Sequence, residues 1–324
     1  MSWSNTKKAS CWRSSGRSAT DSVATTDADA GTPSEEPAAK KASRAGRDLP
    51  AAIAVGVGIG SVLIATLVFY PRGWVVLCAG AIFVASHEVV RRLREAGYVI
   101  PVIPLLIGGQ VTCWLTWPYG AVGALAGFGA TVVVCMFWRL FMQDESRHHD
   151  PDAGPPPPSN YLRDVSATVF LIAWVPLFAS FAALLVYHPH EGAGRVFCLM
   201  LAVVASDVGG YAFGVLFGKH PLVPAISPKK SWEGLGGSLL CGITATFLTA
   251  TFLVHRPPWE GVLLGFVLVF ICVLGDLVES QVKRDIGIKD MGRLLPGHGG
   301  LMDRLDSVLP AAVAAWTVFT LLPA

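Results

Sequence analysis

The chain has 324 residues, of which 52% are hydrophobic and only 15% are charged, and its mean hydropathy is +0.53. This balance excludes a soluble globular domain, because the chain holds many apolar runs near the roughly 20 residues that a bilayer-spanning helix needs. The net charge of +2 is too small to indicate a class of binding partner.

Residues 1–48 are rich in Ser, Ala and Thr with mixed charge, and they contain few aliphatic side chains. Such a segment cannot bury enough apolar surface to fold by itself, so we expect a disordered cytoplasmic tail. A cleaved signal peptide is disfavoured, because no apolar core lies within the first 30 residues.

Nine apolar segments follow the tail, and each is expected to form a transmembrane helix. The predicted fold class is therefore all-α, a polytopic integral membrane protein with about nine transmembrane helices. The segments span about 51–70, 74–90, 98–117, 121–141, 166–187, 196–218, 235–254, 260–279 and 304–323. A polar, Pro-rich cytoplasmic loop, 142–165, divides them into an N-terminal group (49–141) and a C-terminal group (166–324), and its PPPP run favours a polyproline II spacer.

The basic residues are distributed unevenly along the chain. If the helices alternate across the bilayer, the tail and every second loop share one side, which holds 22 of the 25 Lys and Arg residues. The other three, Arg72, Arg195 and Arg256, lie on the opposite side. Because Lys and Arg accumulate in cytoplasmic loops, we expect the N-terminus and the loop 280–303 to face the cytoplasm at the cell membrane.

Asp207 lies inside the apolar segment 196–218. An ionisable side chain at the centre of a membrane helix costs at least about 2.5 kcal/mol, so such residues are candidates for function. Gly210, Gly214 and Gly218 follow at intervals of four, which is typical of a face where two helices pack closely.

The loop "PAISPKKSWEG" (224–234) brings hydroxyls and ammonium groups together at Ser227, Lys229, Lys230 and Ser231. This set suits phosphate oxygens, because lysine supplies positive charge and hydroxyls supply directed donors. The positive-inside rule produces similar loops without any ligand, so both interpretations stay open.

The next polar group ends the apolar segment 260–279, in "GDLVES" (275–280). Asp276, Glu279 and Ser280 are three and four residues apart, so all three can share one helical face. A carboxylate at the membrane boundary is a candidate ligand for a hard cation such as Mg²⁺, which binds few protein carboxylates and leaves other positions to water and phosphate.

The stretch 280–306, "SQVKRDIGIKDMGRLLPGHGGLMDRLD", contains nine formal charges and a histidine between apolar runs. Lys283, Arg284, Lys289 and Arg293 supply cations between its two ends. The "PGHGG" turn lets bare backbone approach a ligand closely. Asp303 and Asp306 then share one face of the last helix, where helix capping explains one carboxylate and not both. Carboxylates at both ends of a cationic loop predict a site for metal and polyphosphate.

This stretch resembles the defining motif of the phosphatidate cytidylyltransferase family: S-x-x-K-R-x-x-x-x-K-D, then P-x-H-G-G and D-R-x-D. Every fixed position is present, at Ser280, Lys283, Arg284, Lys289, Asp290, Pro296, His298, Gly299, Gly300, Asp303, Arg304 and Asp306. "FGKH", "ISPKKSWEG" and "SDVGGYAFG" also resemble the family, although Ser231 stands where the family more often has Thr. The resemblance is strong over about 200–306, a third of the chain.

The resemblance implies the reaction CTP + phosphatidate → CDP-diacylglycerol + pyrophosphate at the cytoplasmic membrane face. It also implies an all-helical, dimerising membrane protein that depends on Mg²⁺, with a second cation such as K⁺ at a paired-metal centre. By motif position, Asp276 and Asp303 would be the metal carboxylates. The expected partners are CTP, phosphatidate and membrane lipids, with no nucleic acid.

Motif and residue chemistry together assign three sets of site residues. The catalytic set is Lys283, Arg284, Lys289, Asp290, His298 and Arg304. The substrate-binding set is Asp207, Ser227, Lys229, Lys230, Glu233, Ser280, Gly299 and Gly300. The metal set is Asp276, Asp303 and Asp306. For His298, a hydrogen bond to phosphate is favoured over proton transfer to a leaving oxygen.

Two other functions are compatible with parts of the pattern. An anion transporter or channel built around Asp207 predicts polar residues on several helices and both faces, whereas here they gather at one face. A related membrane nucleotidyltransferase acting on another lipid phosphate would use the same chemistry. The sequence distinguishes that enzyme only weakly from one that acts on phosphatidate.

Overall fold

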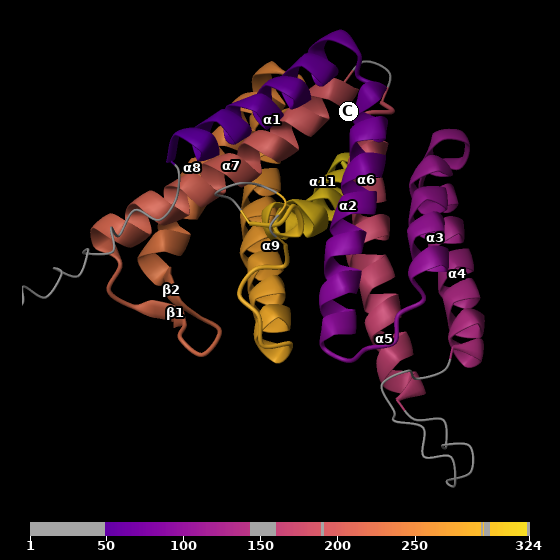
Figure 1. Cartoon of the computed structure of the whole chain (residues 1–324). Helices are drawn as coiled ribbons and strands as arrows, with labels where there is room; N and C mark the ends of the chain where they lie inside the picture. The colour runs from indigo at the N-terminus through magenta and orange to yellow at the C-terminus, as the bar shows by residue number, and fades with distance from the viewer. Residues whose placement is uncertain (1–48, 143–159, 189–190, 293, 295–298, 323–324) are drawn as a thin grey trace, which may run out of the picture. The chain divides into compact units, whose positions relative to one another are not determined.

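The helices of the computed structural model follow the apolar segments of the sequence (Figure 1). The structure describes residues 49–142, 160–188, 191–292, 294 and 299–322. The predicted tail 1–48 and most of the Pro-rich loop therefore lie outside the described residues. The helices are α1 (Leu49–Phe69), α2 (Gly73–Glu95), α3 (Val102–Trp114), α4 (Thr116–Phe141), α5 (Tyr161–Ile172), the π-helical turn η1 (Ala173–Leu177), α6 (Phe178–Leu185), α7 (Gly192–Phe217), α8 (Trp232–Phe252), α9 (Pro258–Asp285), α10 (Met302–Leu305) and α11 (Val308–Leu321).

The predicted fold class, an all-α polytopic membrane protein, is confirmed. Because α5, η1 and α6 are continuous and α10 and α11 nearly so, the described residues form nine helical segments, one for each predicted span. Six of the described segments are long and apolar enough to cross a bilayer: Gly73–Glu95, Thr116–Phe141, Tyr161–Leu185, Gly192–Phe217, Trp232–Phe252 and Pro258–Asp285.

Two segments are shorter than the spans expected from hydropathy. Helix α3 has 13 residues and α11 has 14, which at 1.5 Å per residue gives about 20 Å, against about 30 Å of hydrocarbon. The apolar composition continues past both helices, but the helical backbone conformation does not. Helix α3 begins after Pro101 and α4 follows directly at Thr116, while Asp306 and Ser307 separate α10 from α11.

The loop 219–234 contains a small antiparallel hairpin that the sequence did not lead us to expect. Strand β1 (Pro221–Val223) pairs with β2 (Ser227–Ser231), with Pro221 opposite Ser231. At the end of β2, the Ser231 hydroxyl accepts the backbone N–H of Gly234 at 3.1 Å and caps α8. The hairpin therefore fixes the direction in which its lysines leave the backbone.

Small residues let α7 and α8 pack closely, as the glycine spacing predicted. A Cβ on Gly210 would collide with the Ser238 hydroxyl of α8, which donates to the backbone carbonyl of Ser206 at 2.8 Å. A Cβ on Gly218 would lie 3.0 Å from the Ser231 hydroxyl. Close approach of the two helices brings the hairpin against α7.

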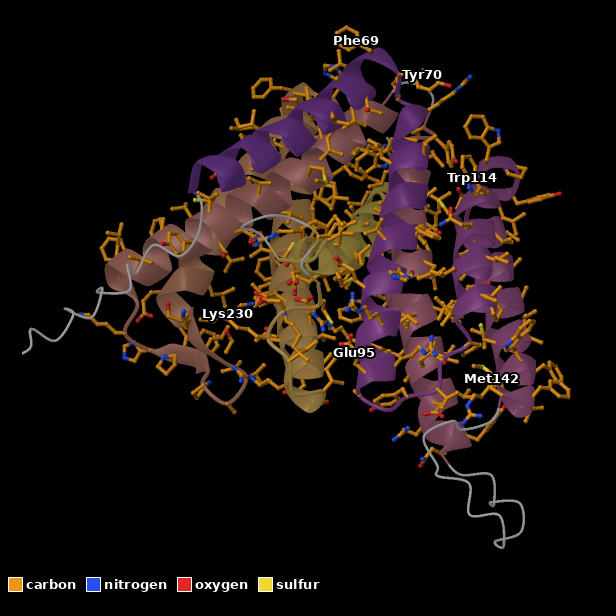
Figure 2. All side chains as sticks on the ribbon, in the orientation of Figure 1. Phe69, Tyr70, Glu95, Trp114, Met142 and Lys230 are labelled. Atoms are coloured by element: carbon orange, nitrogen blue, oxygen red, sulfur yellow. The ribbon has the colours of Figure 1, made fainter. Side chains whose placement is uncertain are left out.

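Hydrogen bonds join alternate loops at one end of the helices. Arg163 donates to the carbonyl of Gly97, Arg92 to that of Met291, and Arg284 to that of Ile226. In Figure 2, the labelled Glu95 and Met142 lie at this end, and Phe69 and Tyr70 lie at the other. We call the first end, which carries the β-hairpin and the C-terminus of α9, the hairpin end. The arrangement agrees with the alternation assumed for the basic residues.

Candidate functional site

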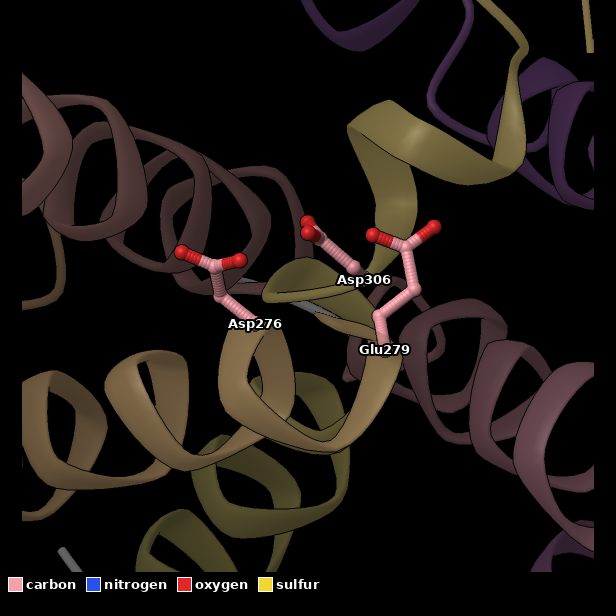
Figure 3. Close-up of side chains that lie close together, drawn as sticks. All are labelled: Asp276, Glu279 and Asp306. Atoms are coloured by element: carbon pink, nitrogen blue, oxygen red, sulfur yellow. The ribbon is translucent and has the colours of Figure 1, made fainter. Parts of the chain in front are cut away.

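Three carboxylates gather where α9 meets the turn between α10 and α11 (Figure 3). Asp276 and Glu279 lie on one face of α9, and Asp306 faces them from the turn; one oxygen of each lies within 4.8 Å of the others. Gly275 permits the contact, because a Cβ there would lie 2.6 Å from the Asp306 carbonyl oxygen. We call Asp276, Glu279 and Asp306 the acid cluster.

Two lysines partly neutralise the acid cluster. The Lys230 Nζ lies 2.5 Å from Asp276 Oδ2, and the Lys283 Nζ lies 2.7 Å from Glu279 Oε2. Glu279 is fully buried, yet its Oε1 has no hydrogen-bond partner among the residues that the structure describes. Three close carboxylates, one with an unpartnered buried oxygen, form an oxygen-rich donor set that fits a hard divalent cation.

Asp303 lies apart from the acid cluster and is held by other groups. It accepts the backbone N–H groups of Met291 (3.1 Å) and Gly300 (2.8 Å), and the Lys283 ammonium (3.1 Å). Burial alone would raise the pKa of the Asp303 carboxyl, but these three donors outweigh it and lower the pKa below its ordinary value. Lys283 thus bridges Glu279 and Asp303 at the two ends of the motif.

A cavity of about 340 Å³ opens beside Asp276 between α7, the hairpin, α8 and α9. Predicted site residues that line it are Asp207, Ser227, Lys229, Lys230 and Asp276. Further hydroxyls come from Ser206, Ser231, Ser238 and Ser307. The cavity therefore combines ammonium and hydroxyl donors with the carboxylates of Asp207 and Asp276, which suits a phosphate-bearing ligand together with a cation.

The remaining predicted residues lie around these two features. Ser280 donates to Asp276 at 3.4 Å, and Arg284 ties α9 to the hairpin through the carbonyl of Ile226 at 2.7 Å. Glu233 stabilises the start of the hairpin, since its carboxylate accepts the backbone N–H of Lys219 and lies 2.7 Å from Nδ1 of His220. The exposed residues Lys289, Asp290 and Arg304 flank the motif loop, Gly299 has φ of +88°, and His298 lies outside the described residues.

Two carboxylates near the site were absent from the predicted set. Glu279 had a usable signal, because it lies three residues after Asp276 and so shares its helical face. Glu88 belongs to the apolar segment 74–90, and its Oε2 accepts the N–H of Met302 at 3.0 Å. Its signal was an ionisable residue inside a predicted membrane span, the same criterion that selected Asp207.

Comparison with known proteins agrees with this geometry. Residues 50–322 match the model of the Cytidylyltransferase family. The chain is 72% identical to a protein named phosphatidate cytidylyltransferase from Mycobacterium tuberculosis, over the full length of both. It is 75% identical to the protein of that name from Mycobacterium leprae, over 93% of this chain and all of the relative.

A more distant relative with the same name, from Staphylococcus epidermidis, is 46% identical over 37% of this chain and 46% of its own length. The resemblance seen in the motif of residues 280–306 is confirmed by these matches. The chain belongs to the cytidylyltransferase family.

Proposed function

We propose that this protein transfers CMP from CTP to phosphatidate and so forms CDP-diacylglycerol and pyrophosphate. One observation carries the proposal: a cavity lined by lysine and serine opens onto the acid cluster, in a chain whose full-length relatives are named for this activity. The acid cluster and the cavity supply the two chemical environments that the reaction needs, one for a cation and one for phosphate oxygens.

The reaction is a substitution at phosphorus. A phosphate oxygen of phosphatidate forms a bond to the α-phosphorus of CTP, and the bond from that phosphorus to the bridging oxygen of the β-phosphate breaks, releasing pyrophosphate. The nucleophile is already ionised at neutral pH, so no strong general base is required. The main barrier is the approach of two anions, and fixed positive charge lowers it most effectively.

The chain supplies that charge from two directions. Lys229 and Lys230 on the cavity wall, with the hydroxyls of Ser227 and Ser231, bind and orient the phosphates of CTP. Lys283 stands between Glu279 and Asp303, so its ammonium is held in one position before substrate arrives. Arg284 and Lys289 add charge at the exposed rim of the motif. His298 donates a hydrogen bond to phosphate.

The acid cluster would hold Mg²⁺ through Asp276, Glu279 and Asp306, and a second cation such as K⁺ completes the predicted pair. When bound, the cation withdraws negative charge from phosphate oxygens and orients them. Asp303 remains a predicted ligand. Its present partners are Lys283 and two backbone N–H groups, so replacement of Asp303 separately from Asp306 distinguishes the two assignments.

The charge distribution supports a cytoplasmic orientation for the hairpin end in the cell membrane. The described helix ends and loops at that end carry most of the described Lys and Arg residues, as expected for the cytoplasmic side. CTP then reaches the cavity from the cytoplasm, and phosphatidate reaches it from the bilayer. A homodimer and a catalytic domain formed by residues 166–324 stay predictions.

A labelling experiment with purified protein in phosphatidate-containing micelles and Mg²⁺ tests the proposed reaction. Label at the α-phosphate of CTP should enter the organic-extractable lipid, whereas label at the γ-phosphate should appear only as water-soluble pyrophosphate. Asp276→Asn should abolish lipid labelling, and EDTA should do the same. Glu260→Gln, at the other end of α9, is the matched control and should keep full activity.

Three outcomes would contradict parts of the proposal. Transfer of γ-label to lipid would identify a kinase reaction instead. Labelling of another lipid phosphate, but not of phosphatidate, would favour the related nucleotidyltransferase. Full activity of Asp276→Asn would remove the acid cluster from the mechanism whatever the substrate.

A further inference from the structure

Glu88 is a carboxylate on α2, far in sequence from the motif of residues 280–306, and it lies against that motif. The side chain is 9% exposed, and its neighbours Ala85, Val89 and Val90 on the same helix are buried apolar residues. A carboxylate in such surroundings is stable only where polar groups meet it. Its observed partner is the backbone N–H of Met302, at 3.0 Å from Oε2.

Met302 is the first residue of α10, so its N–H is one of the groups that a helix leaves without an internal partner. Glu88 supplies that partner from a different helix, and its negative charge also suits the start of a helix. The next residue is Asp303, and Asp306 follows one turn later. The hydrogen bond that Glu88 accepts therefore lies at the start of the short helix that carries Asp303, and Asp306 follows directly after that helix.

Two glycines of the stretch 280–306 leave room for the Glu88 carboxylate. A Cβ on Gly300 would lie 2.7 Å from Glu88 Oε2, and a Cβ on Gly292 would collide with Oε1. Neither glycine has a positive φ, so close approach, and not backbone conformation, explains why a side chain is excluded. Oε1 itself has no hydrogen-bond partner among the described residues.

Arg92, one turn after Glu88, makes a second contact with the same loop. Its Nε donates to the Met291 carbonyl oxygen at 2.9 Å, while the Met291 N–H donates to Asp303. Met291 is therefore held at both of its backbone groups: its carbonyl oxygen accepts from Arg92 of α2, and its N–H donates to Asp303. Met291 is itself buried, so the chain at this residue packs against its neighbours.

We propose that Glu88 is a positioning residue for the reaction. From α2, and with support from Arg92, it fixes the start of α10 and the chain near Met291, Gly292 and Gly300. Asp303, Lys283 and Asp306 thereby keep their arrangement. Glu88 touches no reacting atom in this account and acts through Met302, Gly292 and Gly300. The N-terminal group of helices thus contributes to the site. The kinetic part of the inference rests on the proposed function, whereas the structural part does not.

The test compares Glu88→Ala, Glu88→Gln and the control Glu260→Gln, another largely buried glutamate. Amide hydrogen exchange is followed by mass spectrometry on peptides covering 299–305, and kcat and the KM for CTP are measured in micelles. Glu88→Ala should exchange at least tenfold faster in these peptides and lower kcat at least tenfold, with the KM within threefold. Glu88→Gln keeps an oxygen acceptor and should stay within threefold of wild type in both readouts.

Several results would overturn the proposal. One is unchanged exchange and unchanged kcat in Glu88→Ala. Another is equal loss in the alanine and glutamine variants with faster exchange throughout α2, which would indicate general packing. If Glu88→Ala does not fold, Arg92→Met replaces it and should speed exchange in the same loop; unchanged exchange there would also contradict the proposal. Faster local exchange in a protein whose wild type makes no CDP-lipid would support the positioning role and reject the proposed function.

Discussion

Helix α9 carries charged groups at both of its ends, and the two groups are built differently. Near its start, Glu260 belongs to a network in which Arg256 contacts Glu260 and Glu191, and Arg195 contacts Glu191 at 2.8 Å. Near its other end, 19 residues and about 28 Å away, Glu279 belongs to the acid cluster. The first group has two arginines for two glutamates, while the second gathers carboxylates around fewer cations.

We interpret the difference as one between a structural network and the proposed functional site. Arg256 also donates to the Leu322 carbonyl at 2.6 Å, so the first group ties the chain's end to the loop before α9. The two arginines match the charges of the two glutamates there, although the buried Arg256 Nε has no hydrogen-bond partner among the described residues. At the acid cluster, carboxylates face one another and Glu279 keeps a buried oxygen without a partner among the described residues. Three carboxylates this close together suit a bound cation, which is the role that the proposed function gives them.

The largest effect should come from removing one carboxylate of the acid cluster. Asp306→Asn keeps the shape and the acceptor for the Ser307 N–H, but it removes a charge from the proposed cation site. We expect kcat to fall by about 100-fold to 1,000-fold, the range typical for lost electrostatic stabilisation of a transition state. Without added metal, the melting temperature should stay the same or rise, because repulsion between carboxylates is relieved. A fall in both activity and metal-free stability would indicate a structural role instead.

A somewhat smaller effect on rate is expected at Lys283. Lys283→Met removes the ammonium shared by Glu279 and Asp303 and leaves Glu279 buried without that partner. Activity should fall about 100-fold. The free energy of unfolding should fall by about 3 kcal/mol, as when one member of a buried ion pair is lost. Kinetics and thermal unfolding of the same preparation check both. Retained activity with lower stability would place Lys283 outside the chemistry.

The network at the start of α9 should show the reverse pattern. Arg256→Met leaves Glu260 and Glu191 without their shared cation, and the expected loss of stability is about 3 kcal/mol. The kcat of the folded variant should stay within about twofold of wild type. Assays run well below the melting transition measure this. A loss of kcat comparable to that of Lys283→Met would erase the distinction between the two groups.

The smallest effect is expected at the cap of α8. Ser231→Ala removes the hydroxyl that accepts the Gly234 N–H, which costs about 1 kcal/mol in stability. Ser231→Thr keeps the hydroxyl and should restore most of that stability. Comparison of the two melting temperatures tests the cap, and equal values would show that the hydroxyl has no such role.

The sequence was sufficient for the parts of the molecule that depend on local pattern. Apolar runs predicted every helical segment, and the spacing of Asp276 and Glu279 placed both on one face of α9. The length of α3 was not predictable from hydropathy, because Pro101 and the adjoining start of α4 limit it while the apolar composition continues. The β-hairpin depends on pairing between Pro221 and Ser231 across a turn, which no periodicity in so short a segment announces.

Contacts between distant parts of the chain were the hardest to foresee. Asp303 had been paired with Asp276 from their positions at the two ends of the motif, but the described contacts of Asp303 are with Lys283, Met291 and Gly300. The approach of Glu88 to Gly292 and Gly300 joins residues about 200 positions apart. The sequence shows a carboxylate in an apolar helix, and it led us to assign Gly300 to ligand binding, but nothing in it connects Glu88 with Gly292 or Gly300.

The central claim, that the acid cluster holds a divalent cation, is tested most directly by metal binding. Mn²⁺ can be titrated in place of Mg²⁺ and its free concentration followed by electron paramagnetic resonance. Wild type and Glu260→Gln should bind Mn²⁺ equally, and Asp306→Asn should bind it at least tenfold more weakly. Equal binding by all three proteins, or a loss confined to Asp303→Asn, would contradict the claim.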